Sequence, residues 1–357
     1  MRNGLLDGKR IFVGFDDAGT EGIHSFTRVL KRKGLDIDFY GFDRNPFGVG
    51  PDITIKWWRP TFLRKFLGLI FLLSLLPKYD IFHIYFARNF VHYEIDNFIL
   101  KIAGKKVIYD FRGSDVFDVE KSVRDEGKSS PYYHFYQDRG PRFFKYLAKK
   151  KKFIIEHADQ IILAGPWLVD SVSRYDSIIP YSRDVDQIGS YKRNYSHREF
   201  TILHAPTNSE IKGSKYLSKA IDELRDRGLK VRLITPDRTS REELFDLINR
   251  SDVVVDQLLL GWYGGFAVEA MALEKPVICF IKEEYKKLVP FGEEIPIIGA
   301  NKDNVGEVVE KLIGNRNKLK GLGKRGYEFV KKFHDAEVVA QQYEGVYNKV
   351  LGLYNAT

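Results

Sequence analysis

The feature of this chain that most constrains its fold is a regular alternation of short apolar runs with longer amphipathic segments. The runs are four to six residues long and rich in β-branched side chains, and the segments carry apolar residues at helical spacing. Strands buried on both faces read as continuous apolar runs, and their alternation with helices indicates parallel βαβ units. The expected strands are 10–15, 37–40, 80–85, 106–110 and 160–164 in the first half, and 200–204, 231–234, 252–256 and 277–280 in the second.

Helix ends are marked by local signals. Gly34 and Gly228 close the predicted helices 22–33 and 213–227, as glycine commonly does at a helix C-terminus. The sequence from Ser240 to Glu243 is a capping box that opens a helix ending at Asn249.

Two series of strands and helices predict two doubly wound domains. The polar segment 182–198 lies between the series, and we therefore expect domains at 1–185 and 186–335. A last helix in 336–357 has Val339, Tyr343, Val346 and Tyr347 at helical spacing, so it must pack on a core. We expect it to cross back to the first domain.

Composition limits the classes of protein. The 357 residues suffice for two α/β domains, and 44% are apolar, enough for two cores. The single cysteine, Cys279, excludes a disulfide framework and a cysteine metal cluster, and it fits a reducing compartment. The net charge of +9 favours anionic partners such as phosphates, nucleic acid or anionic lipid.

The most apolar stretch, 66–76, lies near Arg59, Arg64 and Lys65, and a further basic block follows at 149–152. Because a bilayer span needs about 20 apolar residues, this stretch is too short to cross a membrane. Residues 1–9 lack the pattern of a signal peptide. We expect a cytoplasmic protein whose 66–76 helix is buried. The alternative is a basic, apolar helix that touches the inner membrane leaflet.

In open parallel sheets, ligands bind beyond the carboxyl ends of the strands. The first strand is followed by a small-residue turn containing Gly19 and Thr20, although it lacks the G-x-G-x-x-G pattern. Another strand is followed by the turn from Arg112 to Asp115, whose side chains suit sugar hydroxyls or phosphate. A plain turn with a helix cap explains this second pattern equally well.

Two segments in the second half suit an anionic ligand. Thr207, Asn208 and Lys212 follow strand 200–204 and precede the predicted helix 213–227. A lysine at a helix start opposes the helix dipole unless an anion sits there, although a solvated lysine remains the alternative.

Gly264, Gly265 and Phe266 open a helix after strand 252–256, and two glycines allow backbone N–H groups to approach a diphosphate closely. Glu269 follows in what we expect to be the first turn, where it could accept hydrogen bonds from a ribose. An acid favoured by the helix dipole is the equally plain alternative.

These residues resemble the retaining GT-B glycosyltransferases of the family 4 (group 1) type. Three segments carry the resemblance: the 211–213 turn, the 251–256 strand, and 264–277, which is similar to the family signature G-x-x-x-x-E-A-M-A-x-G-x-P-V. The resemblance implies two Rossmann-like domains facing a central cleft, and a metal-independent hexosyltransferase that needs no cofactor besides its nucleotide-sugar co-substrate. The acceptor would be a saccharide, a growing polysaccharide or a lipid-linked molecule.

The resemblance also implies roles. Lys212 would hold the donor diphosphate, with Thr207 and Asn208 beside it; Gly264, Gly265 and Phe266 would supply the helix start, and Glu269 would bind the ribose. Arg112 and Asp115 join Lys212 as candidate catalytic residues, and Gly19, Thr20 and Arg112 would face the acceptor.

The sequence departs from the family pattern at three places. The first glutamate of the family's E-x(7)-E falls at Gly261, unless Asp256 substitutes for it; the arginine that precedes the K-G lysine is absent; and the family histidine falls at Arg112, which we expect to replace part of the missing charge.

Two other classes of function stay open. A GT-B scaffold without turnover would hold a nucleotide or glycan at the same residues. Nucleic-acid binding, suggested by the net charge, is the weaker of the two, because the chain lacks an aromatic–basic recognition motif. The histidines show no zinc-site spacing, and no Walker A loop or G-x-S-x-G elbow occurs.

Overall fold

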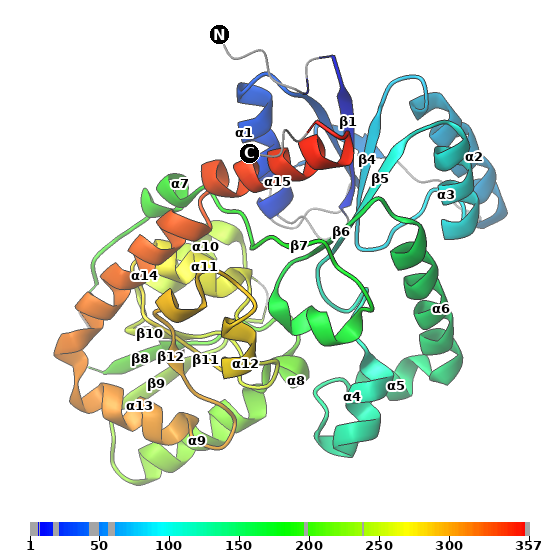
Figure 1. The fold of residues 1–357 in the computed structure, drawn as a ribbon. Helices are drawn as coiled ribbons and strands as arrows, with labels where there is room; N and C mark the ends of the chain where they lie inside the picture. Colours follow the sequence, from blue (N-terminus) through cyan, green and yellow to red (C-terminus); the bar gives the residue numbers. More distant parts are fainter. Residues whose placement is uncertain are drawn as a thin grey trace. The chain divides into compact units, whose positions relative to one another are not determined.

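A computed structural model describes residues 6, 8–16, 21–42, 50–55, 61–195, 199–237 and 239–353. The chain folds into two compact units (Figure 1). The first comprises 1–121, 138–182 and 336–357, and the second comprises 122–137 and 183–335. Residues 336–357 therefore belong to the first unit.

The first unit is built on a parallel sheet of seven strands in the order β3-β2-β1-β4-β5-β6-β7. The strands are β1 (Arg10–Asp16), β2 (Asp36–Phe42), β3 (Ile53–Ile55), β4 (Ile81–Tyr85), β5 (Lys106–Phe111), β6 (Gln160–Leu163) and β7 (Ser177–Ile178). Strand order reverses direction at β1 and β4, which is the doubly wound pattern that the sequence predicts.

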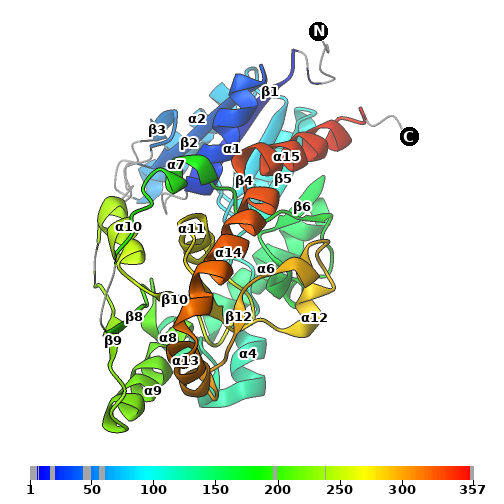
Figure 2. The ribbon, with the colours of Figure 1, turned by 90° about the vertical axis from the view of Figure 1, so that its left-hand side faces the viewer.

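Right-handed crossovers decide which face each helix covers. The chain moves one way from β1 to β2 and the other way from β3 to β4 to β5 to β6. Helix α1 (Glu21–Arg32) therefore covers one face, where α15 (Ala336–Val350) packs against it (Figures 1 and 2). Helices α2 (Thr61–Leu75), α3 (Tyr93–Ile102) and α6 (Pro141–His157) cover the opposite face.

Side-chain alternation along β1 gives each face its own core. Ile11 and Val13 pack with α1 and α15, whereas Phe12 points to the other face and contacts the rings of Tyr40 and Phe82. All three β1 residues are buried, and burying a side chain of this size contributes about 1.5–3 kcal/mol.

A buried polar network ties α15 to the strands beneath it. The Tyr343 hydroxyl donates to Asp110 Oδ2 at 2.8 Å, and the Tyr347 hydroxyl lies 2.9 Å from His83 Nδ1. His83 Nε2 lies 3.5 Å from Asp110 Oδ2, and burial lowers the pKa of this histidine. The last helix is thus attached to β4 and β5 by hydrogen bonds as well as by apolar contacts.

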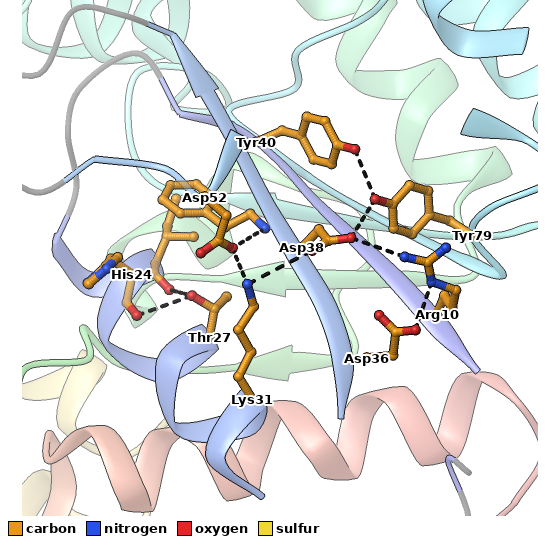
Figure 3. Close-up of polar contacts among 11 residues, drawn as sticks. Arg10, His24, Thr27, Lys31, Asp36, Asp38, Tyr40, Asp52 and Tyr79 are labelled. Atoms are coloured by element: carbon orange, nitrogen blue, oxygen red, sulfur yellow. Dashed lines mark hydrogen bonds and ion pairs between the residues drawn. The ribbon is translucent and has the colours of Figure 1, made fainter. Parts of the chain in front are cut away.

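A second network ties the chain after α2 to β2 (Figure 3). The Tyr79 hydroxyl donates to Asp38 Oδ2 at 2.6 Å and lies 2.9 Å from the Tyr40 hydroxyl. Arg10 pairs with Asp36 at 2.8 Å and lies 3.5 Å from Asp38. These contacts hold the C-terminal end of α2 on the sheet.

Helix α2 is not the buried helix that the sequence suggested. Leu72 and Leu75 are buried, but Phe66 is 60% exposed, and Ile70 and Leu73 are exposed beside it. The apolar composition misled the prediction because the sheet covers only one side of this helix. In the described part of the chain, no helix is both long and apolar enough to cross a bilayer.

The second unit is a parallel sheet of five strands in the order β12-β11-β10-β8-β9. Its strands are β8 (Phe200–Leu203), β9 (Val231–Ile234), β10 (Val253–Val255), β11 (Val277–Cys279) and β12 (Ile298–Gly299). The two parallel-sheet units confirm the predicted α/β fold class.

The remaining helices cover the second sheet and the connections. Figure 2 shows α14 beside α11, which it contacts. The remaining helices are α4 (Val119–Glu126), α5 (Tyr133–Arg139), α7 (Val185–Gly189), α8 (Ser209–Lys212), α9 (Ser214–Asp226), α10 (Arg241–Asn249), α11 (Gly265–Ala272), α12 (Glu283–Lys286), α13 (Val305–Gly314) and α14 (Leu319–Phe333). Short 3₁₀ helices occur at 127–129, 166–171, 292–294 and 316–318. The predicted helix start at Ser240 is confirmed, because the Glu243 N–H donates to the Ser240 hydroxyl at 3.2 Å.

Replacing Tyr343 with phenylalanine tests the buried network. The Asp110 carboxylate loses a donor while staying buried, so we expect Tyr343→Phe to lower the free energy of unfolding by about 1–3 kcal/mol. Urea unfolding followed by circular dichroism measures the change. The control is Tyr195→Phe, whose exposed hydroxyl bonds Asp246 and should cost less than about 0.5 kcal/mol. Equal losses in the two variants would show that the network adds nothing to stability.

Candidate functional site

The candidate site lies at the carboxyl edge of the second sheet. Strands β8 and β10 are parallel neighbours, so the loops that follow them emerge at the same edge. The first loop leads through α8 to Lys212, and the second leads from Asp256 to Gly264. The Leu258 N–H donates to the Lys212 carbonyl at 3.1 Å, which joins the two loops directly.

Lys212 directly precedes Gly213, the N-cap of the predicted helix, and it also ends a short helix that the sequence did not predict. The Asn208 side chain caps α8 by accepting from the Glu210 and Ile211 N–H groups, and Lys212 is the last residue of that single turn. Gly213 then adopts φ +81°, which separates α8 from α9. Lys212 thus lies between the end of α8 and the start of α9. The dipole argument for an anion there stays a prediction, and the position of its amine has a direct cause in the structure.

That cause is Asp256, the residue directly after β10. Its carboxylate is 1% exposed; Oδ1 lies 2.8 Å from Lys212 Nζ, and Oδ2 accepts from the Gly264 N–H at 2.6 Å. One buried carboxylate thus holds the lysine beside the glycine pair. Because both oxygens are engaged, Asp256 acts here as a positioning residue.

Arg183 is the residue that the sequence analysis missed. Its Nε lies 2.9 Å from Glu269 Oε1, and its Nη2 lies 2.3 Å from the place where a β-carbon on Gly265 would stand. The guanidinium therefore lies over the first turn of α11, in space left by a missing side chain. The Arg183 N–H donates to the His334 carbonyl at 2.8 Å, which fixes its backbone.

The first N–H groups of a helix have no acceptor within the helix and carry the positive end of its dipole. At α11 this end is joined by two cationic side chains, Arg183 and Lys212, since Lys212 Nζ lies 3.4 Å from the β-carbon position of Gly264. Such a concentration of positive charge is typical of an anion site.

Glu269 lies one turn deeper than the sequence predicted. Helix α11 begins at Gly265, so its first turn contains no acid and Glu269 is the fifth residue. A dipole preference explains this carboxylate less well than its ion pair with Arg183. Of the other predicted donor residues, Thr207 is exposed, Asn208 caps α8, and Phe266 is half-buried in the first turn of α11.

The absence of the family glutamate at residue 261 has a backbone cause. Gly261 adopts φ +78°, and a β-carbon there would lie 2.7 Å from Lys282 Cγ. A glutamate would need both a strained backbone and displacement of that lysine. The loop therefore cannot present a carboxylate from residue 261 without rearranging.

The buried His204 side chain connects the end of β10 to the start of α9, on either side of the lysine loop. Its Nδ1 lies 2.9 Å from the Val255 carbonyl, and its Nε2 lies 2.8 Å from the Ser214 hydroxyl. Since a carbonyl only accepts, Nδ1 carries the proton and Nε2 accepts from the serine. Burial lowers the pKa of His204, which favours this neutral form.

In the first unit, Arg112 belongs to the network beneath α15. Its Nη2 lies 2.7 Å from Asp110 Oδ2 and bonds the Tyr343 hydroxyl, and its guanidinium lies 5.0 Å from the Tyr85 ring centre. The side chain is 11% exposed. Its charge is thus already balanced inside the first unit, and Arg183 is the better placed cation for the helix start.

Asp115 closes its own turn. Its carboxylate accepts from the Gly113 N–H at 2.6 Å and the Arg112 N–H at 3.2 Å, and burial raises its pKa to about 6. These contacts match the turn that the sequence left as the alternative. Gly19 and Thr20 lie outside the described residues.

Within the described ranges, no three His, Cys, Asp or Glu side chains gather in a way that could hold a metal ion. Metal independence remains a prediction.

The comparisons with known proteins identify the fold. No protein-family model matches the chain, and neither does any curated protein. Among solved structures, sucrose-phosphate synthase of Thermosynechococcus elongatus has a TM-score of 0.64 at 14% identity, covering 97% of this chain and 100% of that one. HepE of Anabaena in complex with UDP-glucose has a TM-score of 0.61 at 13% identity, covering 96% and 99%.

The catalytic domain of starch synthase IV from Arabidopsis thaliana, bound to ADP and acarbose, has a TM-score of 0.57 at 11% identity, covering 97% and 100%. The chain thus has the GT-B fold of glycosyltransferases. At these identities, the likeness shows the fold alone.

The protonation of His204 generates a pH prediction. Burial holds the pKa of His204 in the folded state below the ordinary histidine value of about 6.5, so at acid pH the unfolded chain binds a proton that the folded chain does not. The free energy of unfolding should therefore fall as pH drops from about 7 to about 5, and the fall should be smaller in His204→Gln than in the wild type. Urea unfolding at both pH values measures it. Identical acid losses in the wild type and the variant would contradict the neutral assignment.

Proposed function

We propose that the protein is a glycosyltransferase that takes a sugar from a nucleotide-diphosphate donor held by the second unit. One observation carries the proposal: the start of α11, Lys212 and Arg183 converge on the paired glycines 264 and 265. The first turn of α11 offers backbone N–H groups to a diphosphate, and the two side chains add charge.

The diphosphate is the leaving group of the reaction. An acceptor hydroxyl attacks the anomeric carbon, the bond from that carbon to the diphosphate oxygen breaks, and the hydroxyl proton is released to a base. Negative charge then grows on the departing diphosphate. Donors fixed in place before the reaction stabilise that charge without reorganisation, which is commonly the largest catalytic contribution.

Glu269 takes the nucleoside in this proposal. A carboxylate one turn into α11 accepts hydrogen bonds from the vicinal ribose hydroxyls while the diphosphate lies at the helix start. Arg183 then contacts two anionic groups, Glu269 and the diphosphate, and so fixes the position of one relative to the other. The nucleotides in similar structures, UDP-glucose in HepE and ADP in starch synthase IV, support a nucleoside diphosphate as ligand.

The acceptor is assigned to the first unit as a proposal. Gly19, Thr20, Arg112 and Asp115 remain its candidate residues, with Arg112 and Asp115 shaping the turn that meets the acceptor. The acceptor class is a saccharide or a lipid-linked molecule. Stereochemical retention and metal independence are proposed on the resemblance to family 4, since Lys212, Arg183 and α11 supply the positive charge that a metal would otherwise bring.

The second candidate function is nucleotide or glycan binding without turnover. Gly261 favours it, because no carboxylate stands where the resembled family has one. Incubation with donor alone separates the two: slow release of free sugar indicates a transferase, and binding without release indicates the scaffold.

Removing either cation should weaken nucleotide binding. We expect Lys212→Ala and Arg183→Ala each to raise the dissociation constant of UDP or GDP about tenfold or more, because each removes one charge-assisted contact to the diphosphate. Isothermal titration calorimetry measures the change. The control Lys219→Ala removes a lysine that is exposed on α9. Unchanged affinity in both cation variants would place the nucleotide elsewhere.

Glu269 should matter to turnover through the donor. We expect Glu269→Ala to cut kcat/KM at least about tenfold, chiefly by raising KM for the nucleotide sugar. Donors are first chosen by thermal shift with UDP-, GDP-, ADP- and CMP-sugars, since a ligand that binds the folded state raises the melting temperature. The exposed Glu223→Ala serves as control. Near-normal turnover of the Glu269 variant would rule out its ribose role.

A further inference from the structure

The large exposed apolar side chains of the described chain gather on two helices. Eleven such residues occur in the described ranges, and six of them lie on α2 and α3. These six are Phe66, Ile70 and Leu73 on α2, and Ile95, Phe98 and Ile102 on α3. Phe98 is 66% exposed and Ile102 is 72% exposed. Scattered apolar side chains are ordinary on a surface, but a contiguous group marks an interaction site.

Each trio lies along one face of its helix. The α2 residues are spaced i, i+4, i+7 and the α3 residues i, i+3, i+7, so each forms a stripe. Both helices turn their other faces inward, where Leu72 of α2 and Leu100 of α3 are fully buried. The stripes are therefore the outer faces of helices that the sheet already holds.

The two stripes belong to one side of the first unit. Right-handed crossovers place α2 and α3 on the same face of the sheet, and the ring of Phe71 on α2 lies 5.9 Å from that of Phe90, three residues before α3. Both helices appear on the right of Figure 1. The Tyr79 network described above fixes α2 from its C-terminal end. The surface is therefore presented by well-anchored elements.

A groove of about 840 Å³ extends the surface from α3 towards α6. Phe98 and Phe153 line it with three lysines, Lys101, Lys105 and Lys106. Its two acids are paired, Glu94 with Lys149 and Asp159 with Lys106.

The charges beside this surface are cationic. Residues 61–79 contain Arg64, Lys65 and Lys78 and no acid, and Lys65 and Lys78 are exposed. Lys101 is exposed on α3. The two acids of α3 are engaged: Asp96 is buried and accepts from the Phe90 and Val91 N–H groups, and Glu94 lies 3.7 Å from Lys149.

We propose that the outer faces of α2 and α3 form a docking surface for an anionic lipid bilayer. The six apolar side chains enter the boundary between headgroups and acyl chains, and Lys65, Lys78 and Lys101 meet the anionic headgroups. Helices with an apolar face and basic margins lie in this way in the interfacial plane. A second copy of the chain suits the surface less well, because its lysines would face their own like charges.

The proposal is independent of the donor site, since its residues lie on the first unit and α11 on the second. It deepens the proposed function in one respect, because a membrane-docked enzyme reaches a lipid-linked acceptor.

Vesicle co-sedimentation of the full chain tests the surface. We expect binding to vesicles of phosphatidylcholine with phosphatidylglycerol, and at least about tenfold weaker binding to phosphatidylcholine alone or in high salt. Absence of binding to both vesicle types overturns the proposal, and equal binding to both overturns its electrostatic part.

Two variants locate the contact. The triple change Phe66→Ser, Ile70→Ser, Leu73→Ser and the pair Ile95→Ser, Phe98→Ser should each reduce binding at least about tenfold. All five residues are exposed, so the melting temperature should hold. The control pair Tyr175→Ser, Leu288→Ser removes exposed apolar residues elsewhere and should leave binding unchanged. If the control pair loses as much vesicle binding as the two variants do, the assigned location is overturned.

Charge reversal tests the cationic margin. Lys65→Glu with Lys101→Glu should abolish the preference for anionic vesicles, whereas Lys219→Glu on α9 should not. UDP affinity of these variants should stay at the wild-type value, so failure of docking and failure of donor binding are read separately. Sedimentation velocity without lipid tests the alternative that the surface binds a second copy of the chain. If the wild type dimerises and the serine variants do not, the surface is a dimer interface and the membrane proposal is overturned.

Discussion

The candidate site depends on one buried carboxylate, Asp256. It lies at the end of β10 and binds two partners that come from different directions, the Lys212 amine and the Gly264 N–H. Without it, the lysine would have no reason to point across to α11, and the glycine pair would have no anchor. A buried charge is costly alone, so these two partners also stabilise the carboxylate that positions them.

Around this carboxylate, the protein assembles positive charge where a helix already supplies it. Arg183 and Lys212 lie at the start of α11, where Arg183 occupies the space that a β-carbon on Gly265 would fill. Like charges repel, so such an arrangement persists because Asp256 and Glu269 balance it, and an incoming diphosphate would balance it further. Arg112 differs from these two cations, because its guanidinium bonds Asp110 and Tyr343 and so helps to attach α15 to the first sheet.

The long strands and most helices were predictable from the sequence. Continuous apolar runs, the helix-ending Gly34 and Gly228, and the capping box at Ser240 are local signals, and they report local structure. Three strands at sheet edges, β3, β7 and β12, were not predicted, because they are short and none of their residues is buried, so they show no continuous apolar run. The single turn α8, which ends at Lys212, was also not predicted, because four residues are too few for a helical period to show.

The sequence by itself determined the α/β class, the two series of strands and the candidate segments around Lys212 and Glu269, because periodicity and turn chemistry act over a few residues. Only the tertiary structure decided that Arg183 meets Glu269, 86 residues away, and that α2 keeps an apolar face uncovered. Ion pairs between distant segments and the burial of a helix face depend on which elements the sheet topology brings together. That information is not present in any local stretch of the chain.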